Sequence, residues 1–149
     1  NFVTDNPGSI GPFDAWFFRG IALAEIILIS AFIYAITMAV IHRKRLTDHA
    51  WWLVSTVFIV MFPAMGRGLQ AVWIAIYGFD PAIDIVVMIP LYVSQCIIIA
   101  ATLAAAYYLK VLRHTATYLA VGVNAAVFLM EPMGRSEFLE GVLTTLIKA

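Results

Sequence analysis

Charged residues are scarce in this chain: they make up 12% of its 149 residues, whereas 63% are hydrophobic. A soluble domain of this length usually carries about 25% charged residues and about 45–50% apolar ones. No water-soluble fold could bury so much apolar surface, so the composition excludes a soluble globular domain and indicates an integral membrane protein. Because nine basic residues balance nine acidic ones, the chain has no bulk attraction for nucleic acid.

Residue types that usually carry chemistry are also few. The single Cys96 cannot form an internal disulfide, and we expect it to be a small buried hydrophobe. No Gly-rich phosphate loop, G-x-S-x-G or H-E-x-x-H motif occurs, so we predict no catalytic residues and a protein that is not an enzyme. None of the three histidines lies within a predicted span, which argues against histidine-ligated haem or chlorophyll inside the membrane.

Four mostly apolar stretches are long enough to cross the hydrocarbon core, which takes roughly 20 such residues. They cover residues 15–41, 50–77, 85–109 and 117–133. The links between them are short, so neighbouring spans should be antiparallel and in contact. The sequence therefore predicts a single all-α domain, an integral membrane four-helix bundle.

A shorter helix is predicted after the fourth span. Apolar residues recur at helical spacing over residues 136–148, and Glu137, Glu140 and Lys148 lie on the other side. This pattern is typical of an amphipathic helix that is too short to span the bilayer. We expect it to lie on the outer surface or against a partner.

Basic residues gather in two of the three links between spans. Residues 42–49 and 110–116 contain Lys and Arg, whereas residues 78–84 contain two aspartates and no base. By the positive-inside rule, the two basic links face the cytoplasm and both termini lie on the other side. Aromatic residues at the predicted boundaries agree, and they place Trp51 and Trp52 at the inner interface.

A short motif, M-x-P followed by M-G-R, occurs in the second span at residues 61–67 and again at residues 130–135. Both copies lie at the same distance from the outer surface, which indicates two helical hairpins in tandem, related by an axis along the membrane normal. Parallel repeats of that kind occur in transporters. The alternative is convergent helix-end chemistry, because Pro and Gly near the end of a helix stop or kink it.

A cluster of polar residues lies within the spans and at their outer ends, where such residues are costly and usually functional. Counted at about 1.5 Å per residue from the inner boundary, most of them fall at nearly one level in the outer part of the bilayer. The members are Glu25, Arg67, Gln70, Gln95, Asn124, Glu131 and Arg135.

Helical spacing puts all of these residues except Glu25 on one face of the second, third or fourth span, and we expect the three faces to point inward. In that arrangement Arg67 pairs with Glu131. The hydrogen-bonding walls around the pair are Gln70, Gln95 and Asn124.

Two interpretations of the cluster stay open. In the structural one, the ion pair and the amides hold the helices together, while Arg135 extends to lipid headgroups. In the functional one, they line a cavity, open to the outer side, that binds a polar group of a small ligand, lipid or cofactor. Glu25 is also placed to meet another subunit, because its face of the first span carries apolar residues.

His42, His49 and His114 lie in the two basic links. With Asp48 they offer a weak metal site, although their spacing matches no recognised ligand pattern. Neighbouring Arg and Lys residues favour contact with lipid phosphate instead.

The stretch from Ile41 to Arg67, where H-R-K-R-L-T-D-H-A-W-W-L opens a span ending in P-A-M-G-R, resembles a loosely defined group of uncharacterised bacterial multi-span membrane proteins. In that group a basic loop with H-R and then H-x-x-W leads into a helix that ends in Arg. By that resemblance the marked positions are His42, Arg43, His49, Trp52 and Arg67. The resemblance covers under a fifth of the chain. It implies a bacterial inner membrane and no particular activity.

These features support more than one function. The first expectation is a non-enzymatic accessory or structural subunit of a larger membrane complex or homo-oligomer, packing against partner helices, lipid or cofactor. The alternative is a small transporter or ligand-binding membrane carrier that works as a dimer through an outer-leaflet polar cavity. A third, weaker option is a membrane redox or lipid-modifying enzyme that uses the cytoplasmic histidines. Bound lipid is expected, and no cofactor is indicated.

Overall fold

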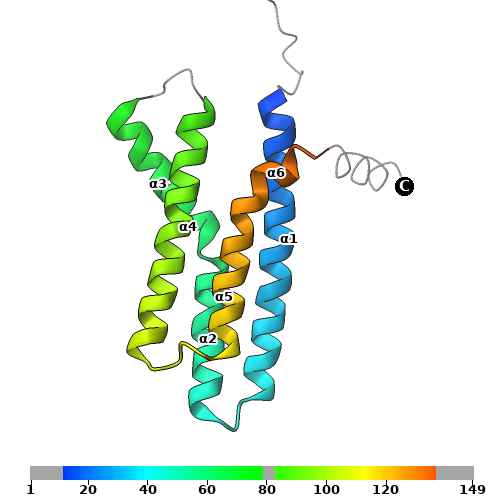
Figure 1. The fold of residues 1–149 in the computed structure, drawn as a ribbon, viewed down its shortest axis with the longest axis vertical. Helices are drawn as coiled ribbons and strands as arrows, with labels where there is room; N and C mark the ends of the chain where they lie inside the picture. The colour runs from blue at the N-terminus through cyan, green and yellow to red at the C-terminus, as the bar shows by residue number, and fades with distance from the viewer. Residues whose placement is uncertain (1–11, 79–82, 137–149) are drawn as a thin grey trace, which may run out of the picture.

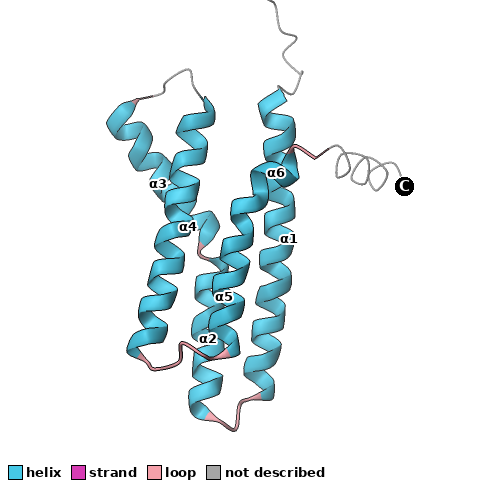
Figure 2. Cartoon of the chain, viewed as in Figure 1, coloured by secondary structure: helices cyan, strands magenta, loops and turns pink. Residues whose placement is uncertain are grey.

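The computed structural model describes residues 12–78 and 83–136, with side chains for residues 16–78 and 86–136. Within these ranges every regular element is helical, so the predicted all-α fold is confirmed (Figure 2). The amphipathic helix predicted over residues 136–148 lies outside the described residues.

The helices lie roughly along one axis, alternate in direction, and form an elongated bundle (Figure 1). In chain order they are α1 (Pro12–Ile41), α2 (Leu46–Val60), α3 (Phe62–Tyr77), α4 (Ile83–Tyr108), α5 (Thr115–Ala126), the 3₁₀ helix η1 (Val127–Leu129) and α6 (Met130–Gly134). Three stretches are long and apolar enough to cross a membrane: Trp16–Ile41, Val86–Tyr108 and Thr115–Gly134. The described helices α2 and α3 make a fourth if they are taken together as one bent span. The chain is an integral membrane protein.

The second predicted span is not one continuous helix. Its two parts, α2 and α3, meet at Met61 with a bend of 42°. Pro63 explains the break, because it has no N–H to donate to the carbonyl of Ile59 and its ring crowds that carbonyl. Beyond the bend, α3 packs against α4 and diverges from α1 (Figure 1).

The fourth predicted span is also interrupted. Here α5 tightens into η1 and continues as the short α6, in which Pro132 removes the N–H that would pair with the Phe128 carbonyl. The helix α6 packs against α1 and so covers a part of α1 that α3, turned away by the bend, does not contact closely. Two antiparallel hairpins result, one from α1 with the bent α2 and α3, and one from α4 with α5 to α6.

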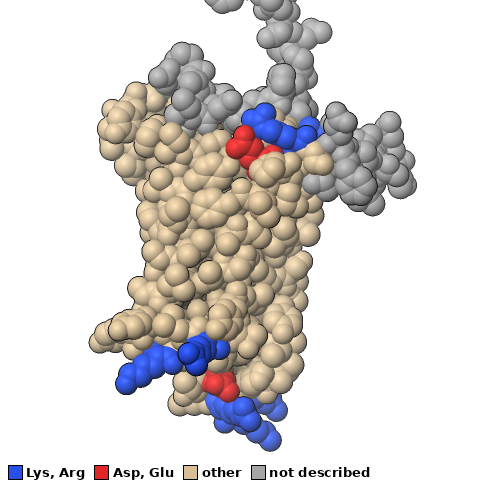
Figure 3. Space-filling view, viewed as in Figure 1, with Lys and Arg blue, Asp and Glu red and all other residues tan. Residues whose placement is uncertain are grey.

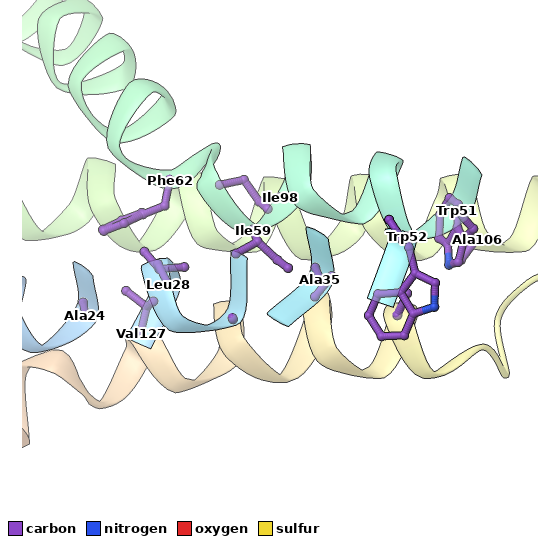
Figure 4. Packing of buried hydrophobic residues seen from close by; sticks show 14 residues of the cluster. Ala24, Leu28, Ala35, Trp51, Trp52, Ile59, Phe62, Ile98, Ala106 and Val127 are labelled. Atoms are coloured by element: carbon purple, nitrogen blue, oxygen red, sulfur yellow. The ribbon is translucent and has the colours of Figure 1, made fainter. Parts of the chain in front are cut away.

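The core lies between α1, α2, α4 and α5. One face of α1 is lined with small side chains, and Ala24, Ala31, Ala35 and Ala39 are all buried there. Such residues let helix backbones approach closely, which is how helices associate without a hydrophobic driving force in lipid. Larger side chains of α2 and α4, including Trp52, Ile59 and Ile98, fill the space opposite (Figure 4).

Trp51 and Trp52 lie at the end of the bundle that carries the basic links, but their rings face the core rather than the lipid. They are only 3% and 2% exposed. The indole N–H of Trp51 donates to the Thr117 hydroxyl at 2.9 Å, and the Trp52 ring lies against the rings of His42 and His114. With these polar partners, both indoles close the end of the core. Exposed aromatic side chains also lie near this end: Tyr34, Tyr107, Tyr108 and Tyr118.

Cys96 is exposed, which corrects the expectation of a buried residue. It follows the fully buried Gln95 on α4, so a rotation of about 100° per residue turns it out of the core. Ile97 and Val93 share this exposed side of α4. The thiol therefore faces the lipid side of the bundle.

Both basic links lie at one end of the bundle, here called the basic end (Figures 1 and 3). It comprises the α1–α2 link with Arg43, Lys44 and Arg45, and the α4–α5 link with Lys110 and Arg113. The start of α1 and the end of α6 lie at the opposite end. On the face seen in Figure 3, the charged side chains gather at the two ends and the surface between them is uncharged.

Candidate functional site

A cavity of about 220 Å³ lies between α1, α3 and α4, in the half of the bundle farthest from the basic end; we call it the α1–α3 cavity. Most of its wall is apolar. Phe17 and Ile21 of α1 lie one helical turn apart on it, as do Val87 and Leu91 of α4. Phe62, at the start of α3, forms part of the wall near the bend, close to Leu28 and Ala24 (Figure 4).

The bend and a glycine together open this cavity. The bend at Pro63 turns α3 toward α4, and Gly66 then lets the two helices pack closely. A Cβ atom on Gly66 would lie 2.8 Å from Cδ2 of Leu91, closer than side chains normally approach. Since α3 is held on α4, a space remains beside α1 at the level of Glu25.

Three polar side chains open into the cavity: Glu25 from α1, and Arg67 and Gln70 from α3. Glu25 and Arg67 are exposed, and Gln70 is half-buried. Within residues 16–78 and 86–136, none of the three makes a hydrogen bond or an ion pair. Their formal charges cancel, but each charge still lacks a partner in an apolar setting, which is costly. The three groups are free to bind a ligand.

The predicted pair of Arg67 with Glu131 is wrong. Glu131 instead pairs with Arg135 one turn along α6, at 3.1 Å, and accepts a hydrogen bond from the Tyr92 hydroxyl, also at 3.1 Å. The Arg135 guanidinium lies 4.3 Å from the centre of the Trp16 ring. Both carboxylate oxygens of Glu131 are engaged in this network. The physical reason is the bend, which packs α3, the helix that carries Arg67, against α4, while α6 packs on α1.

Tyr92 was missed by the sequence analysis. It connects α4 to the end of the fourth span, because its ring also stacks on Phe128 with centroids 5.6 Å apart. A signal was present, since Tyr92 precedes Gln95 by three residues and so lies near the same face of α4. A hydroxyl on that face is a natural donor to the Glu131 carboxylate.

The two copies of the repeated motif place their arginines in different surroundings. When the copies are aligned on Gly-Arg, Pro63 occupies the position that Glu131 holds in the second copy, four residues before the arginine. Arg135 therefore finds a carboxylate on its own helix, whereas Arg67 has none there. This single difference explains why one arginine is paired and the other opens into the cavity.

Gln95 and Asn124 face inward as predicted, but they do not line the α1–α3 cavity. Both are fully buried, at 0% exposure. The Asn124 amide donates to the carbonyls of Ala120, at 2.8 Å, and of Phe58, at 3.2 Å. Among the described residues, the Asn124 side-chain oxygen and both amide atoms of Gln95 have no hydrogen-bond partner. Gln95 lies one turn beyond Leu91, so these amides form a layer between the cavity and the basic end.

The side chains of His42 and His49 contact backbone carbonyls in the last turn of α1. The Nδ1 atom of His42 lies 2.8 Å from the Met38 carbonyl oxygen, and that of His49 lies 2.8 Å from the Ala39 carbonyl oxygen. Carbonyls in the last turn of a helix have no partner within the helix, and the imidazole of His49 supplies one for Ala39. The Met38 carbonyl also accepts the backbone N–H of His42, at 3.0 Å.

His114 is the N-cap of α5. Its Nδ1 accepts a hydrogen bond from the backbone N–H of Ala116 at 3.1 Å, and its Nε2 lies 3.7 Å from an Asp48 oxygen. In the parts of the chain that the structure describes, no group of three or more His, Cys, Asp or Glu side chains is arranged to hold a metal ion. The weak metal site considered for these histidines is therefore not assembled there.

No protein-family model, curated protein or solved structure matches this chain. The fold and the cavity define its class: a helical integral membrane protein with an apolar-walled cavity that holds a carboxylate, a guanidinium and an amide.

The seven predicted cluster residues fall into three groups. Glu25, Arg67 and Gln70 share the cavity, Glu131 and Arg135 form a closed pair, and Gln95 and Asn124 lie in the buried layer.

Proposed function

We propose that this protein is a ligand-binding membrane carrier and that the α1–α3 cavity is its binding site. One observation carries the proposal: two oppositely charged side chains, Glu25 and Arg67, open into one cavity without pairing to each other or to another described residue. If these charges only held helices together, they would be expected to form a contact such as the hydrogen bond from Tyr92 to Glu131, which joins α4 to α6. The structural interpretation therefore suits Glu131 and Arg135, and the functional one suits Glu25 and Arg67.

The bent span adds support. Membrane carriers commonly place their ligand where a spanning helix is interrupted, because the break opens space and frees polar groups. Here the bend between α2 and α3 lies beside Pro63, which contributes to the cavity wall. A mostly apolar wall with a few convergent polar groups is typical of small-molecule sites.

The size of the cavity limits what it holds. At about 220 Å³ it is smaller than the roughly 300–1,000 Å³ of sites for drug-sized ligands. It suits a small molecule, or the headgroup of a larger molecule whose remainder lies in the surrounding lipid.

The proposed setting is a bacterial inner membrane with the basic end in the cytoplasm. Arg43, Lys44, Arg45, Lys110 and Arg113 lie at one end of the bundle, and an excess of such residues marks cytoplasmic links. Both termini then lie outside, and the cavity lies in the outer leaflet. The bacterial assignment rests on the resemblance of the segment from Ile41 to Arg67.

The test fills the cavity and asks whether a bound molecule is lost. Val87 lines the cavity, whereas Val93, on the same helix, is exposed on the lipid side. The wild type, Val87→Phe and Val93→Phe are purified from native membranes in mild detergent, and native mass spectrometry records any added mass. We expect a molecule on the wild type and on Val93→Phe but not on Val87→Phe. Equal occupancy of the three proteins, or none on the wild type, would rule out the cavity as a binding site.

A second candidate is the accessory subunit of a larger membrane complex. The observation that favours it is the position of Glu25, which is exposed on α1 among lipid-facing residues such as Ile26 and Ile29. A partner helix that carried a basic group could pair with it. A stoichiometric membrane protein that copurifies with the wild type and is lost from Glu25→Gln would favour this candidate over the carrier.

A further inference from the structure

We propose that the α1–α3 cavity selects a zwitterionic ligand, whose anionic group binds Arg67 and whose ammonium group binds Glu25. This inference rests on the proposed function and adds the chemical class of the ligand. Its basis is the charge of the cavity wall, because the Glu25 carboxylate and the Arg67 guanidinium open into the same cavity.

Charge balance favours a ligand that carries both signs. A purely anionic ligand would satisfy Arg67 and leave the Glu25 carboxylate unpaired beside a second negative charge, and a purely cationic ligand would do the reverse. An unpaired charge in an apolar environment is strongly unfavourable. A neutral ligand would leave both charges without a partner. A zwitterion pairs both and adds no net charge to the membrane interior.

The side chains match the two ends of such a molecule. The planar guanidinium of Arg67 donates parallel hydrogen bonds, which fit the oxygens of a phosphate or a carboxylate. Gln70 follows Arg67 by three residues on the same face of α3 and offers the anion an amide N–H. The Glu25 carboxylate only accepts hydrogen bonds, and an ammonium group only donates them. Because Glu25 lies on α1, the ligand bridges two helices.

The apolar wall indicates where the rest of the ligand lies. Ile21 and Phe17 lie one and two turns before Glu25 on its own helix, and Leu91 and Val87 line the cavity from α4. A cavity of about 220 Å³ accommodates a phosphoethanolamine headgroup but not two acyl chains, which would extend into the bilayer. The same chemistry is found in an outer-leaflet phospholipid with an ammonium headgroup and in a free amino-acid-like zwitterion.

The test compares headgroups on the purified, full-length protein. Short-chain phosphatidylethanolamine, phosphatidylglycerol and diacylglycerol are titrated into the detergent-solubilised protein, and native mass spectrometry measures the occupancy of each. For the wild type we expect phosphatidylethanolamine to bind about tenfold more tightly than phosphatidylglycerol, because only the former satisfies Glu25. Glu25→Gln should abolish this preference, and Arg67→Gln should weaken the binding of both phospholipids.

Arg135→Gln is the matched control. It removes an arginine from the second copy of the same motif, outside the α1–α3 cavity, and should leave the preference unchanged. Glu25 and Arg67 make no contact that holds the described fold together, so their variants are expected to fold, which a thermal unfolding scan checks.

The outcomes separate the two proposals. Tight binding of phosphatidylglycerol or diacylglycerol, equal to that of phosphatidylethanolamine, would overturn the zwitterion and leave the carrier intact. If the Glu25→Gln variant still preferred phosphatidylethanolamine, the zwitterion proposal would likewise fail and the carrier proposal would stand. Absence of all binding, with no effect of Val87→Phe, would overturn both. Glycerophosphoethanolamine distinguishes the source: if it displaces the lipid completely, the ligand is a free zwitterion, and if it does not, the acyl chains contribute and the ligand is a lipid.

Discussion

A methyl group added at Gly134 should separate α6 from α1. A Cβ atom there would clash with the Trp16 carbonyl oxygen and lie 3.2 Å from both Cα and N of Gly20. These are backbone atoms, so no side-chain rotation relieves the contact and the helices must move apart. Overpacking of this kind costs about 1–3 kcal/mol, and the backbone contacts put Gly134→Ala near the upper end, at about 2–3 kcal/mol.

Two other glycines make this a graded series. At Gly66 the nearest atom to an added Cβ is the end of the flexible Leu91 side chain, at 2.8 Å, so Gly66→Ala should lose only about 1 kcal/mol. At Gly122 nothing lies within 4 Å, and the residue is inside α5. Gly122→Ala should therefore gain about 0.5–1 kcal/mol from the better helix propensity of alanine.

The assay is reversible unfolding in mixed micelles, with helicity followed as the denaturing detergent increases. The expected order of stability is Gly122→Ala, wild type, Gly66→Ala and Gly134→Ala. If Gly134→Ala were as stable as Gly122→Ala, the close approach of α1 and α6 would be refuted. The position of the Glu131–Arg135 pair would then have to be reconsidered.

The same unfolding assay checks the remaining predictions. Gln95→Leu should raise the free energy of unfolding by about 1–2 kcal/mol, because both buried amide atoms lack described partners; a loss of stability would show that they are satisfied in the membrane. Asn124→Leu should lower it by about 1–2 kcal/mol, since it removes the hydrogen bond to the Phe58 carbonyl, and a neutral result would contradict that bond. Trp51→Phe should cost about 1 kcal/mol through the lost bond to Thr117. Thr117→Val also removes the bond from its hydroxyl to the Val111 carbonyl, so the double variant should lose more than Trp51→Phe alone but less than the sum of the two single changes.

The fold class follows from the sequence because a membrane span is specified mainly by the length and apolarity of a segment. The break in the second span was also foreseeable, since Pro63 removes a backbone donor. Its direction was not, because the side on which α3 packs depends on the contact of Gly66 with Leu91, which joins residues far apart in the chain. The predicted partner of Arg67 depended on that direction and was therefore wrong.

Residues near helix ends show a second limit. Trp51 and Trp52 are hydrophobic and lie at a span boundary, so sequence alone does not separate an interfacial ring from one that closes the core. Their hydrogen-bonding and ring partners, Thr117 and His114, come from the fourth span and the link before it. The exposure of Cys96, by contrast, could have been predicted, since Gln95 was already assigned to the inward face.

The central claim, that Glu25 and Arg67 hold a ligand between them, is tested most directly by an experimental structure of the protein extracted gently from its native membrane. We expect density in the α1–α3 cavity that contacts both side chains while α3 stays packed on α4. An empty site in which α3 has closed onto α1 and Glu25 pairs directly with Arg67 would contradict it.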